Sequence, residues 1–239
     1  MNSIVLAAGR GSRMKEVVPK VLVDVEGEPM LKRIVSACKN KHINKKIVVV
    51  GSNANLIQNV LNTDVEYAYQ MVPLGTLDAF VQSLPLVSTS DVLVLPGDLP
   101  CVTKEVIEDI IEYYLQNHCR NLVIGMRVAN PVHYGRMVKS EFGKTKIIEE
   151  KNATIEELNT MIVNTGIYIL KVEDIYPYLT ISKKDETTNE YYLTDYINYL
   201  AENNKLSTLI YPETYVLKGA NDMLTLRNIL KQKNKINKW

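Results

Sequence analysis

Short runs of apolar residues alternate along the first half of the chain with stretches in which apolar residues recur every three or four positions. Continuous β-branched runs predict strands buried on both faces, and the wider spacing predicts helices with one buried face. The expected strands are 4–6, 47–50, 65–69 and 92–95, and the expected helices are 30–38, 55–61, 75–84 and 105–115. This order predicts an α/β fold with a doubly wound, mostly parallel sheet flanked by helices, a Rossmann-like arrangement.

The pattern changes near residue 121. Strands are expected at 122–128, 136–139, 146–149 and 163–170, with a short helix or loop in the 150s, and these segments predict a smaller mixed sheet inserted or appended over the first. Helices return at 193–201 and 222–230 around a strand at 207–211, and the basic tail 231–239 is expected to be a fraying helix end. We expect one domain over 1–239, with 1–120 as its nucleotide-binding part and 121–230 as its sugar-phosphate-binding part.

Charge and cysteine content exclude several classes of protein. The formal net charge of +1 argues against a nucleic-acid binder that works by bulk electrostatics. The three cysteines, Cys38, Cys101 and Cys119, are odd in number and lack a CxxC pair, so neither a disulfide framework nor a structural zinc site is indicated. No apolar run approaches the length of a membrane span, and the N-terminus lacks a leader pattern. We expect a cytoplasmic protein with no nucleic-acid or membrane partner.

A basic, glycine-bearing loop follows the first strand. Residues 6–14 read LAAGRGSRM, and Gly9 and Gly11 let the backbone turn sharply so that successive N–H groups can hold an anion. Four cationic side chains lie nearby in the sequence: Arg10, Arg13, Lys15 and Lys20. A phosphate is the expected guest, although an ordinary tight turn with solvated charges uses the same residues. The loop is neither a Walker A motif nor a dinucleotide fingerprint, which requires glycine where Met14 stands.

Two oxygen-bearing side chains are candidates for a metal site beside this loop. Asp98 follows the strand 92–95 in a Pro-Gly-Asp turn and reaches the same sheet edge as the loop if the strands are parallel, but such an aspartate is also a common turn former. Asn221 precedes the last helix, where it is equally a good N-cap. A triphosphate arrives with Mg²⁺, which needs hard oxygen ligands. Because no GxSxG or HExxH motif occurs, the chemistry should depend on positioning and charge neutralisation, as in phosphoryl or nucleotidyl transfer.

An ordered series of motifs runs through nearly the whole chain. It comprises LAAGRGSRM, the Pro19-Lys20-Val21-Leu22 run, Gln70 with Leu74-Gly75-Thr76, Gly97-Asp98, Tyr134-Gly135-Arg136, Ile148-Glu149, Asn164-Thr165-Gly166, NEYYLTD at 189–195 and Gly219-Ala220-Asn221. In this series the chain resembles the sugar-phosphate nucleotidylyltransferases. It is most similar to the N-acetylglucosamine-1-phosphate uridylyltransferase part of the bifunctional bacterial enzyme that makes UDP-N-acetylglucosamine.

The resemblance implies a nucleotide-diphospho-sugar transferase fold and a role for each matched residue. Arg13 and Lys20 would be the catalytic cations, and Asp98 and Asn221 would hold Mg²⁺. The nucleotide would be bound by Leu6, Ala7, Ala8, Gly9, Gly11, Gln70, Gly75 and Thr76, and the sugar by Gly135, Glu149, Asn164, Tyr192 and Thr194. The implied reaction is in-line attack by N-acetylglucosamine-1-phosphate on the α-phosphorus of UTP, which releases pyrophosphate and forms UDP-N-acetylglucosamine, a cell-envelope precursor.

The chain departs from the family pattern at three positions. Pro96 stands where tyrosine is common, His133 where glycine is frequent and Met223 where arginine is frequent. The resemblance also implies a second domain, a β-helix of hexapeptide repeats with acetyltransferase activity, whose repeats do not occur in this sequence. We therefore expect no acetyl-CoA step. Because trimerisation in the family depends largely on that β-helix, we expect a monomer or weak homo-oligomer.

Several alternatives remain open from the sequence. The chain could be a related nucleotidylyltransferase that uses dTTP or CTP, another sugar-1-phosphate or a phosphorylated alcohol. It could be a nucleotide-sugar-binding regulator without turnover, although a pure binder need not retain the full set of cations and metal ligands. A nicotinamide dehydrogenase is disfavoured because its glycine pattern is missing.

Overall fold

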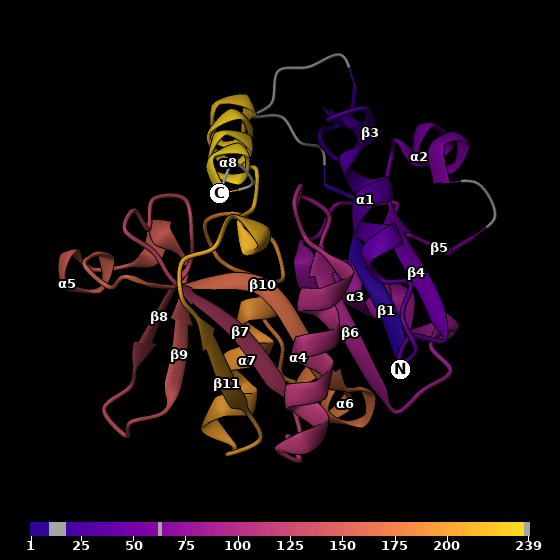
Figure 1. Cartoon of the computed structure of the whole chain (residues 1–239). Coiled ribbons are helices and arrows are strands. Elements are labelled where there is room, and N and C mark those ends of the chain that lie inside the picture. The colour runs from indigo at the N-terminus through magenta and orange to yellow at the C-terminus, as the bar shows by residue number, and fades with distance from the viewer. Residues whose placement is uncertain (10–17, 62–63, 237–239) are drawn as a thin grey trace.

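A central mixed sheet with helices on both faces forms the body of the protein. The computed structural model describes residues 1–9, 18–61 and 64–236, and the strand order within them is β11-β7-β10-β6-β1-β4-β5 (Figure 1). The strands of this path are β1 (Asn2–Leu6), β4 (Lys45–Val50), β5 (Glu66–Tyr69), β6 (Asp91–Pro96), β7 (Leu122–Arg127), β10 (Ile162–Lys171) and β11 (Ser207–Tyr211).

The first strand lies inside the parallel part of the sheet. β1 pairs in parallel with β4 on one side and with β6 on the other, and β5 continues beyond β4. After β1, the chain adds β4 and β5 on one side of β1 and then returns to add β6 on the other side. The carboxyl end of β1 therefore lies at a topological switch point, the place where open α/β sheets bind ligands. The predicted doubly wound fold is confirmed.

The second half of the chain does not form a separate sheet, which corrects the prediction. β10 pairs antiparallel with both β6 and β7, so it extends the central sheet, and β11 adds to β7 in parallel. The hairpin of β8 (Arg136–Lys139) and β9 (Thr145–Ile148) branches off β10 through the pair Val163 and Arg136. The reason is the apolar run 167–170 of β10, which is fully or almost fully buried and fits a central strand.

Two hydrophobic cores cover the two faces of the sheet, since alternate residues of a strand point to opposite sides. In β1, Ile4 belongs to one core and Val5 to the other. The Val5 core includes residues of α1 (Met30–Ala37), α2 (Ala54–Leu61), α4 (Lys104–Gln116) and α8 (Met223–Ile236). The Ile4 core includes residues of α3 (Thr76–Ser83), α6 (Ile175–Leu179) and α7 (Leu193–Glu202). No helix within the described ranges has both the length and the apolarity needed to cross a membrane.

Short elements complete the fold. These short elements are the two-stranded sheet of β2 (Asp24–Val25) and β3 (Glu28–Pro29), the helix α5 (Ile155–Leu158), and the 3-10 turns η2 (Lys20–Leu22), η3 (Leu84–Leu86), η4 (Glu150–Asn152), η5 (Val172–Asp174) and η6 (Tyr215–Leu217). Helix α5 lies in the 150s, where a short helix or loop was predicted, whereas β2 and β3 were not predicted. The internal Pro177 concealed helix α6. Residues 231–236 of the tail form the end of α8, where Lys233 pairs with Glu26, and residues 237–239 lie outside the described residues.

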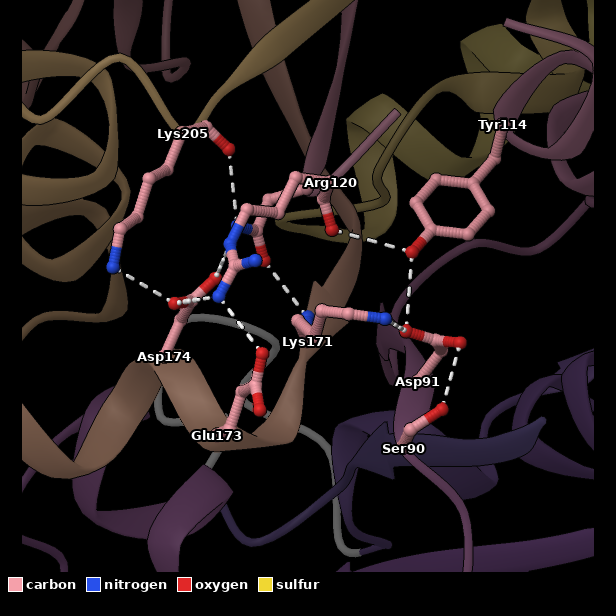
Figure 2. Close-up of polar contacts among 9 residues, drawn as sticks. Ser90, Asp91, Tyr114, Arg120, Lys171, Glu173, Asp174 and Lys205 are labelled. Carbon is pink, nitrogen blue, oxygen red and sulfur yellow. Dashed lines mark hydrogen bonds and ion pairs between the residues drawn. The ribbon is translucent and has the colours of Figure 1, made fainter. Parts of the chain in front are cut away.

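A network of charged side chains fixes the sheet edge at the amino ends of the parallel strands (Figure 2). Asp174, whose side chain is 2% exposed, accepts two hydrogen bonds of 2.7 Å from Arg120 and others from Lys205 at 2.9 Å and Asn121 at 3.0 Å. Burial acts to raise the pKa of Asp174, but these hydrogen bonds outweigh burial and hold the pKa well below its usual range. Beside this group, Lys171 of β10 pairs with Asp91 of β6 at 3.0 Å.

Candidate active site

A cavity of about 560 Å³ opens at the carboxyl ends of β1 and β6. Its lining contains most of the residues predicted to be catalytic or to bind nucleotide and metal: Leu6, Ala7, Ala8, Gly9, Lys20, Gln70, Gly75, Thr76, Asp98 and Asn221. Gly11 and Arg13 lie outside the described residues. Segments far apart in the sequence therefore meet at the switch point of the sheet, in a cavity large enough for a nucleotide.

Close approach of two strands builds the floor of this cavity. The Gly97 N–H donates to the Leu6 carbonyl at 2.9 Å, and a Cβ on Gly97 would lie only 2.7 Å from that oxygen. On the other side, the Ala7 N–H donates to the Val49 carbonyl at 2.9 Å. Small residues are needed here because any larger side chain at Gly97 would push β6 away from β1. The next residue, Asp98, is thereby held against the end of β1.

An ion pair lies in the lining of the cavity. Lys20 Nζ lies 2.5 Å from Asp98 Oδ2, and the two side chains are only 16% and 23% exposed. Lys20 begins the turn η2 directly after Pro19, which fixes the backbone entering the turn. The Ala220 N–H donates to the Asp98 carbonyl at 2.8 Å, so the segment that carries Asn221 is tied to the same place. The structure therefore joins Lys20, Asp98 and Asn221 from three separate regions of the chain.

A partly buried tyrosine lies near Asp98. Burial raises the pKa of Tyr134 to about 12, and the Asp98 carboxylate adds to the shift. The phenol is therefore neutral at physiological pH.

The oxygen ligands present suit Mg²⁺. Asp98 offers a carboxylate and Asn221 an amide oxygen, and Mg²⁺ is commonly held by one or two protein oxygens together with substrate phosphates and water. Among the described residues, no group of three or more His, Cys, Asp or Glu side chains could hold a metal ion. A metal at Asp98 would therefore take further ligands from the substrate.

The predicted base-binding residues Gln70, Gly75 and Thr76 line the same cavity. Gln70 is 6% exposed, and its side-chain amide nitrogen donates to the Gly75 carbonyl at 2.9 Å and to Asp78 Oδ2 at 2.7 Å. Gly75 precedes α3, and Asp78 lies in the first turn of that helix. Asp78 was not singled out from the sequence because its contact with Gln70 spans the loop 71–75. The only sequence signal was an acidic residue in a predicted first helical turn.

The segment 190–193, which we call the strap, packs against segment 74–77, which carries the predicted base-binding residues Gly75 and Thr76. Its Tyr191 N–H donates to the Leu74 carbonyl at 2.7 Å, and its Tyr191 carbonyl accepts from the Leu77 N–H at 3.0 Å. Thr76 Oγ1 also accepts from the Leu193 N–H at 2.9 Å. Glu190 itself lines the cavity, which the motif NEYYLTD alone did not show. The strap continues directly into α7, so segment 74–77 is connected to the predicted sugar-binding residue Thr194 of α7.

The predicted sugar-binding residues form a group beside the cavity without lining it. Thr194 Oγ1 donates to Glu149 Oε1 at 2.8 Å, and the Asn164 N–H donates to the Gly135 carbonyl at 2.9 Å. The Asn164 side chain donates to the Tyr168 hydroxyl at 2.7 Å. Asn164 lies where the pairing of β10 with β7 shifts its register, a bulge of the kind that re-aims side chains near functional sites.

Tyr192 stands slightly apart from this group. Its hydroxyl lies 3.2 Å from Lys151 Nζ and 2.9 Å from Thr188 Oγ1, and Lys151 also stacks over its ring at 4.9 Å. Lys151 in turn pairs with Asp185 at 3.0 Å. Tyr192, the third residue of the strap, thus anchors the strap to η4, next to Glu149.

Two departures from the family pattern have structural counterparts. His133 has a φ of +71°, in the left-handed region that favours glycine, and its N–H donates to Glu150 Oε1 at 2.9 Å. Pro96 lines the cavity and would touch a Cβ on Gly166 at 3.3 Å, so it lies between this cavity and the Asn164 bulge.

Sequence comparison matches residues 3–158 to a family described as MobA-like NTP transferase domain. The chain belongs to this family. It is therefore a nucleotidyltransferase, and the resemblance drawn from its motifs is confirmed at that level. The matched region of the NTP transferase domain includes the loop after β1, Gln70 and Asp98, whereas the Asn164 bulge, the strap and Asn221 lie beyond it.

Among curated proteins, this NTP transferase is similar to two proteins named bifunctional protein GlmU. The one from Carboxydothermus hydrogenoformans is 35% identical over 97% of this chain and 52% of its own length. The one from Caldanaerobacter subterraneus subsp. tengcongensis is 34% identical over 95% of this chain and 50% of its own length. The chain spans about half the length of these relatives.

Solved structures share the fold of this NTP transferase. A putative glucose-1-phosphate thymidylyltransferase from Bacillus anthracis, in complex with a sucrose, superposes with a TM-score of 0.77 at 20% identity over 96% of this chain and 93% of that one. A UDP-glucose pyrophosphorylase complexed with UDP-glucose gives a TM-score of 0.78 at 18% identity over 98% of each chain. At these identities the similarity establishes the fold alone.

Proposed function

We propose that the chain is a Mg²⁺-dependent uridylyltransferase that forms UDP-N-acetylglucosamine and pyrophosphate from UTP and N-acetylglucosamine-1-phosphate. One observation carries the proposal: a single cavity is lined both by Gln70, whose amide is held by the Gly75 carbonyl, and by the Lys20–Asp98 pair with Asn221. A base bound at Gln70 would extend its phosphates toward Lys20. The similarity to the GlmU proteins supports this choice of substrates.

Charge neutralisation is the main requirement of such a reaction, because two anionic substrates must approach each other. Lys20 provides a largely buried cation whose present partner is Asp98. When a triphosphate enters, Lys20 would donate its hydrogen bonds to phosphate oxygens at the reacting centre, while Asp98 and Asn221 would hold the Mg²⁺. The bound metal would neutralise phosphate charge at the α-phosphorus. Arg13 would add a further cation from the loop.

The reaction needs no general base from the protein. The attacking oxygen of a sugar phosphate is already ionised at neutral pH, so positioning and electrostatic stabilisation suffice. Tyr134, with its raised pKa, stays protonated beside Asp98 and adds no charge to the centre.

The acceptor sugar would bind at the Gly135, Glu149, Asn164 and Thr194 group. Carboxylate and amide groups there suit the hydroxyls and the acetamido group of N-acetylglucosamine, and Tyr192 would border the sugar from the strap. The Pro96 side chain, which separates this group from the nucleotide cavity, would lie near the junction of the two substrates.

Pyrophosphate release tests the proposal. Purified protein is assayed with each of the four common nucleoside triphosphates, with and without Mg²⁺, against a panel of sugar-1-phosphates that includes N-acetylglucosamine-1-phosphate. We expect turnover with UTP and that sugar, only when Mg²⁺ is present. Turnover with dTTP or with glucose-1-phosphate instead would replace the substrate assignment while keeping the reaction class. Nucleotide binding without any turnover would support the alternative that the chain is a nucleotide-sugar-binding regulator.

Variants of the central ion pair test the residue roles. Asp98→Ala and Lys20→Ala should each lower kcat at least about a hundredfold, since each removes a group that stabilises transition-state charge. The matched controls are Asp64→Ala and Lys39→Ala, which break an ion pair of 2.8 Å whose side chains are 59% and 54% exposed. These controls should keep wild-type turnover. If the Asp98 and Lys20 variants were as active as the two control variants, the roles assigned to Lys20 and Asp98 would be refuted.

A further inference from the structure

The Gln70 amide has one favourable orientation in this structure. Its nitrogen donates to two acceptors, the Gly75 carbonyl at 2.9 Å and Asp78 Oδ2 at 2.7 Å. Rotating the amide by 180° would place its oxygen against both acceptors and leave a buried side chain without its hydrogen bonds. The amide oxygen is therefore the group with which Gln70 can meet a ligand.

Asp78 is well placed to enforce this orientation. It lies in the first turn of α3, where the helix dipole favours a negative charge, and its other oxygen accepts from Gln82 Nε2 at 3.2 Å. Both partners of the Gln70 nitrogen can only accept hydrogen bonds, but the charged Asp78 carboxylate is a stronger acceptor than the uncharged Gly75 carbonyl. The charged partner thus contributes the larger part of the orientation energy.

We propose that Asp78 is a positioning residue for base selection. By holding the Gln70 nitrogen, Asp78 makes Gln70 present an acceptor to the base, which suits a pyrimidine with a proton on N3, such as uracil or thymine. Cytosine carries an unprotonated acceptor at N3, which would face the Gln70 oxygen unfavourably. The inference deepens the proposed function, because it assumes that the base of the nucleotide substrate binds at Gln70.

The decisive variant is Asp78→Asn, which keeps the shape of the side chain but can also donate a hydrogen bond. The rotated Gln70 amide then finds a donor at position 78, so the preference for one orientation weakens. We expect the ratio of the Kd for CTP to the Kd for UTP, measured by titration calorimetry with Mg²⁺, to fall about tenfold. The rescue variant Asp78→Glu keeps an acceptor-only partner and should retain most of the UTP preference.

The matched control is Glu66→Gln, which makes the same change of charge at an exposed carboxylate of β5 that pairs with Lys45 at 3.0 Å. This control should leave the CTP to UTP ratio unchanged. If Asp78 served folding alone, Asp78→Asn would raise the Kd for CTP and the Kd for UTP by the same factor, and that result would overturn the proposal. Wild-type protein that binds CTP as tightly as UTP would also overturn it.

The binding readout separates this inference from the proposed function. Absence of turnover with every sugar-1-phosphate would refute the proposed reaction, yet the nucleotide titrations would still test Asp78. Conversely, efficient uridylyl transfer with an unchanged ratio in Asp78→Asn would refute only the role of Asp78.

Discussion

Replacing Gly75 with alanine should disturb both halves of the candidate site at once. Gly75 has a φ of +104°, and a Cβ there would lie 2.4 Å from the Tyr191 carbonyl oxygen and 2.8 Å from the Tyr191 nitrogen. Both Tyr191 groups are already bonded, to Leu77 and Leu74. The strap can therefore make room for the methyl group only by breaking these two hydrogen bonds.

The cost can be worked out from these contacts. An alanine in the left-handed region costs roughly 1–2 kcal/mol, and each backbone hydrogen bond lost contributes roughly 1 kcal/mol. The Gly75→Ala variant should thus lower the free energy of unfolding by about 3–4 kcal/mol. The matched control is Gly27→Ala, because Gly27 has a φ of +89° and a Cβ there would meet no atom within 4 Å. It should lose only the conformational part, about 1–2 kcal/mol.

Urea unfolding followed by circular dichroism measures both free energies, and pyrophosphate release measures the KM values. In Gly75→Ala we expect the KM for UTP to rise about tenfold, because the displaced Gly75 carbonyl no longer holds the Gln70 amide. The KM for the sugar-1-phosphate should also rise, since the strap leads into α7. Equal destabilisation in Gly75→Ala and Gly27→Ala, or an unchanged KM for UTP, would refute the reasoning.

Two further predictions concern other parts of the molecule. Asp174→Asn should lower the free energy of unfolding by about 2 kcal/mol at pH 7, because it removes the charge that binds Arg120, Lys205 and Asn121. Since the pKa of Asp174 is lowered in the folded state, its contribution is full above the ordinary aspartate pKa of about 4 and declines below it, so urea titrations should show the variant and wild type converging in acid. Thr194→Val, which removes the 2.8 Å hydrogen bond to Glu149, should raise the KM for the sugar-1-phosphate about tenfold with little change in the KM for UTP, and equal effects on both would contradict a sugar-side role.

The local elements were readable from the sequence because their signals are local. The β-branched run 47–50 and the helical spacing in 105–115 both lie inside the observed β4 and α4. Helix α6 was missed because Pro177 interrupts its pattern, and the pairing of β10 was missed because an apolar strand does not encode its neighbours. The motifs named most of the cavity lining, but they did so through the family resemblance and without any geometry.

The sequence by itself determined which segments are strands and helices, since apolar periodicity reports burial directly, and it placed small residues where strands had to end in tight loops. Only the tertiary structure decided which of these ends meet. The register of β1 with β6 and the close approach at Gly97 bring Asp98 to Lys20, and the strap brings α7 to segment 74–77. The orientation of the Gln70 amide was likewise decided in three dimensions, because it depends on contacts with Gly75 and Asp78 that no sequence period specifies.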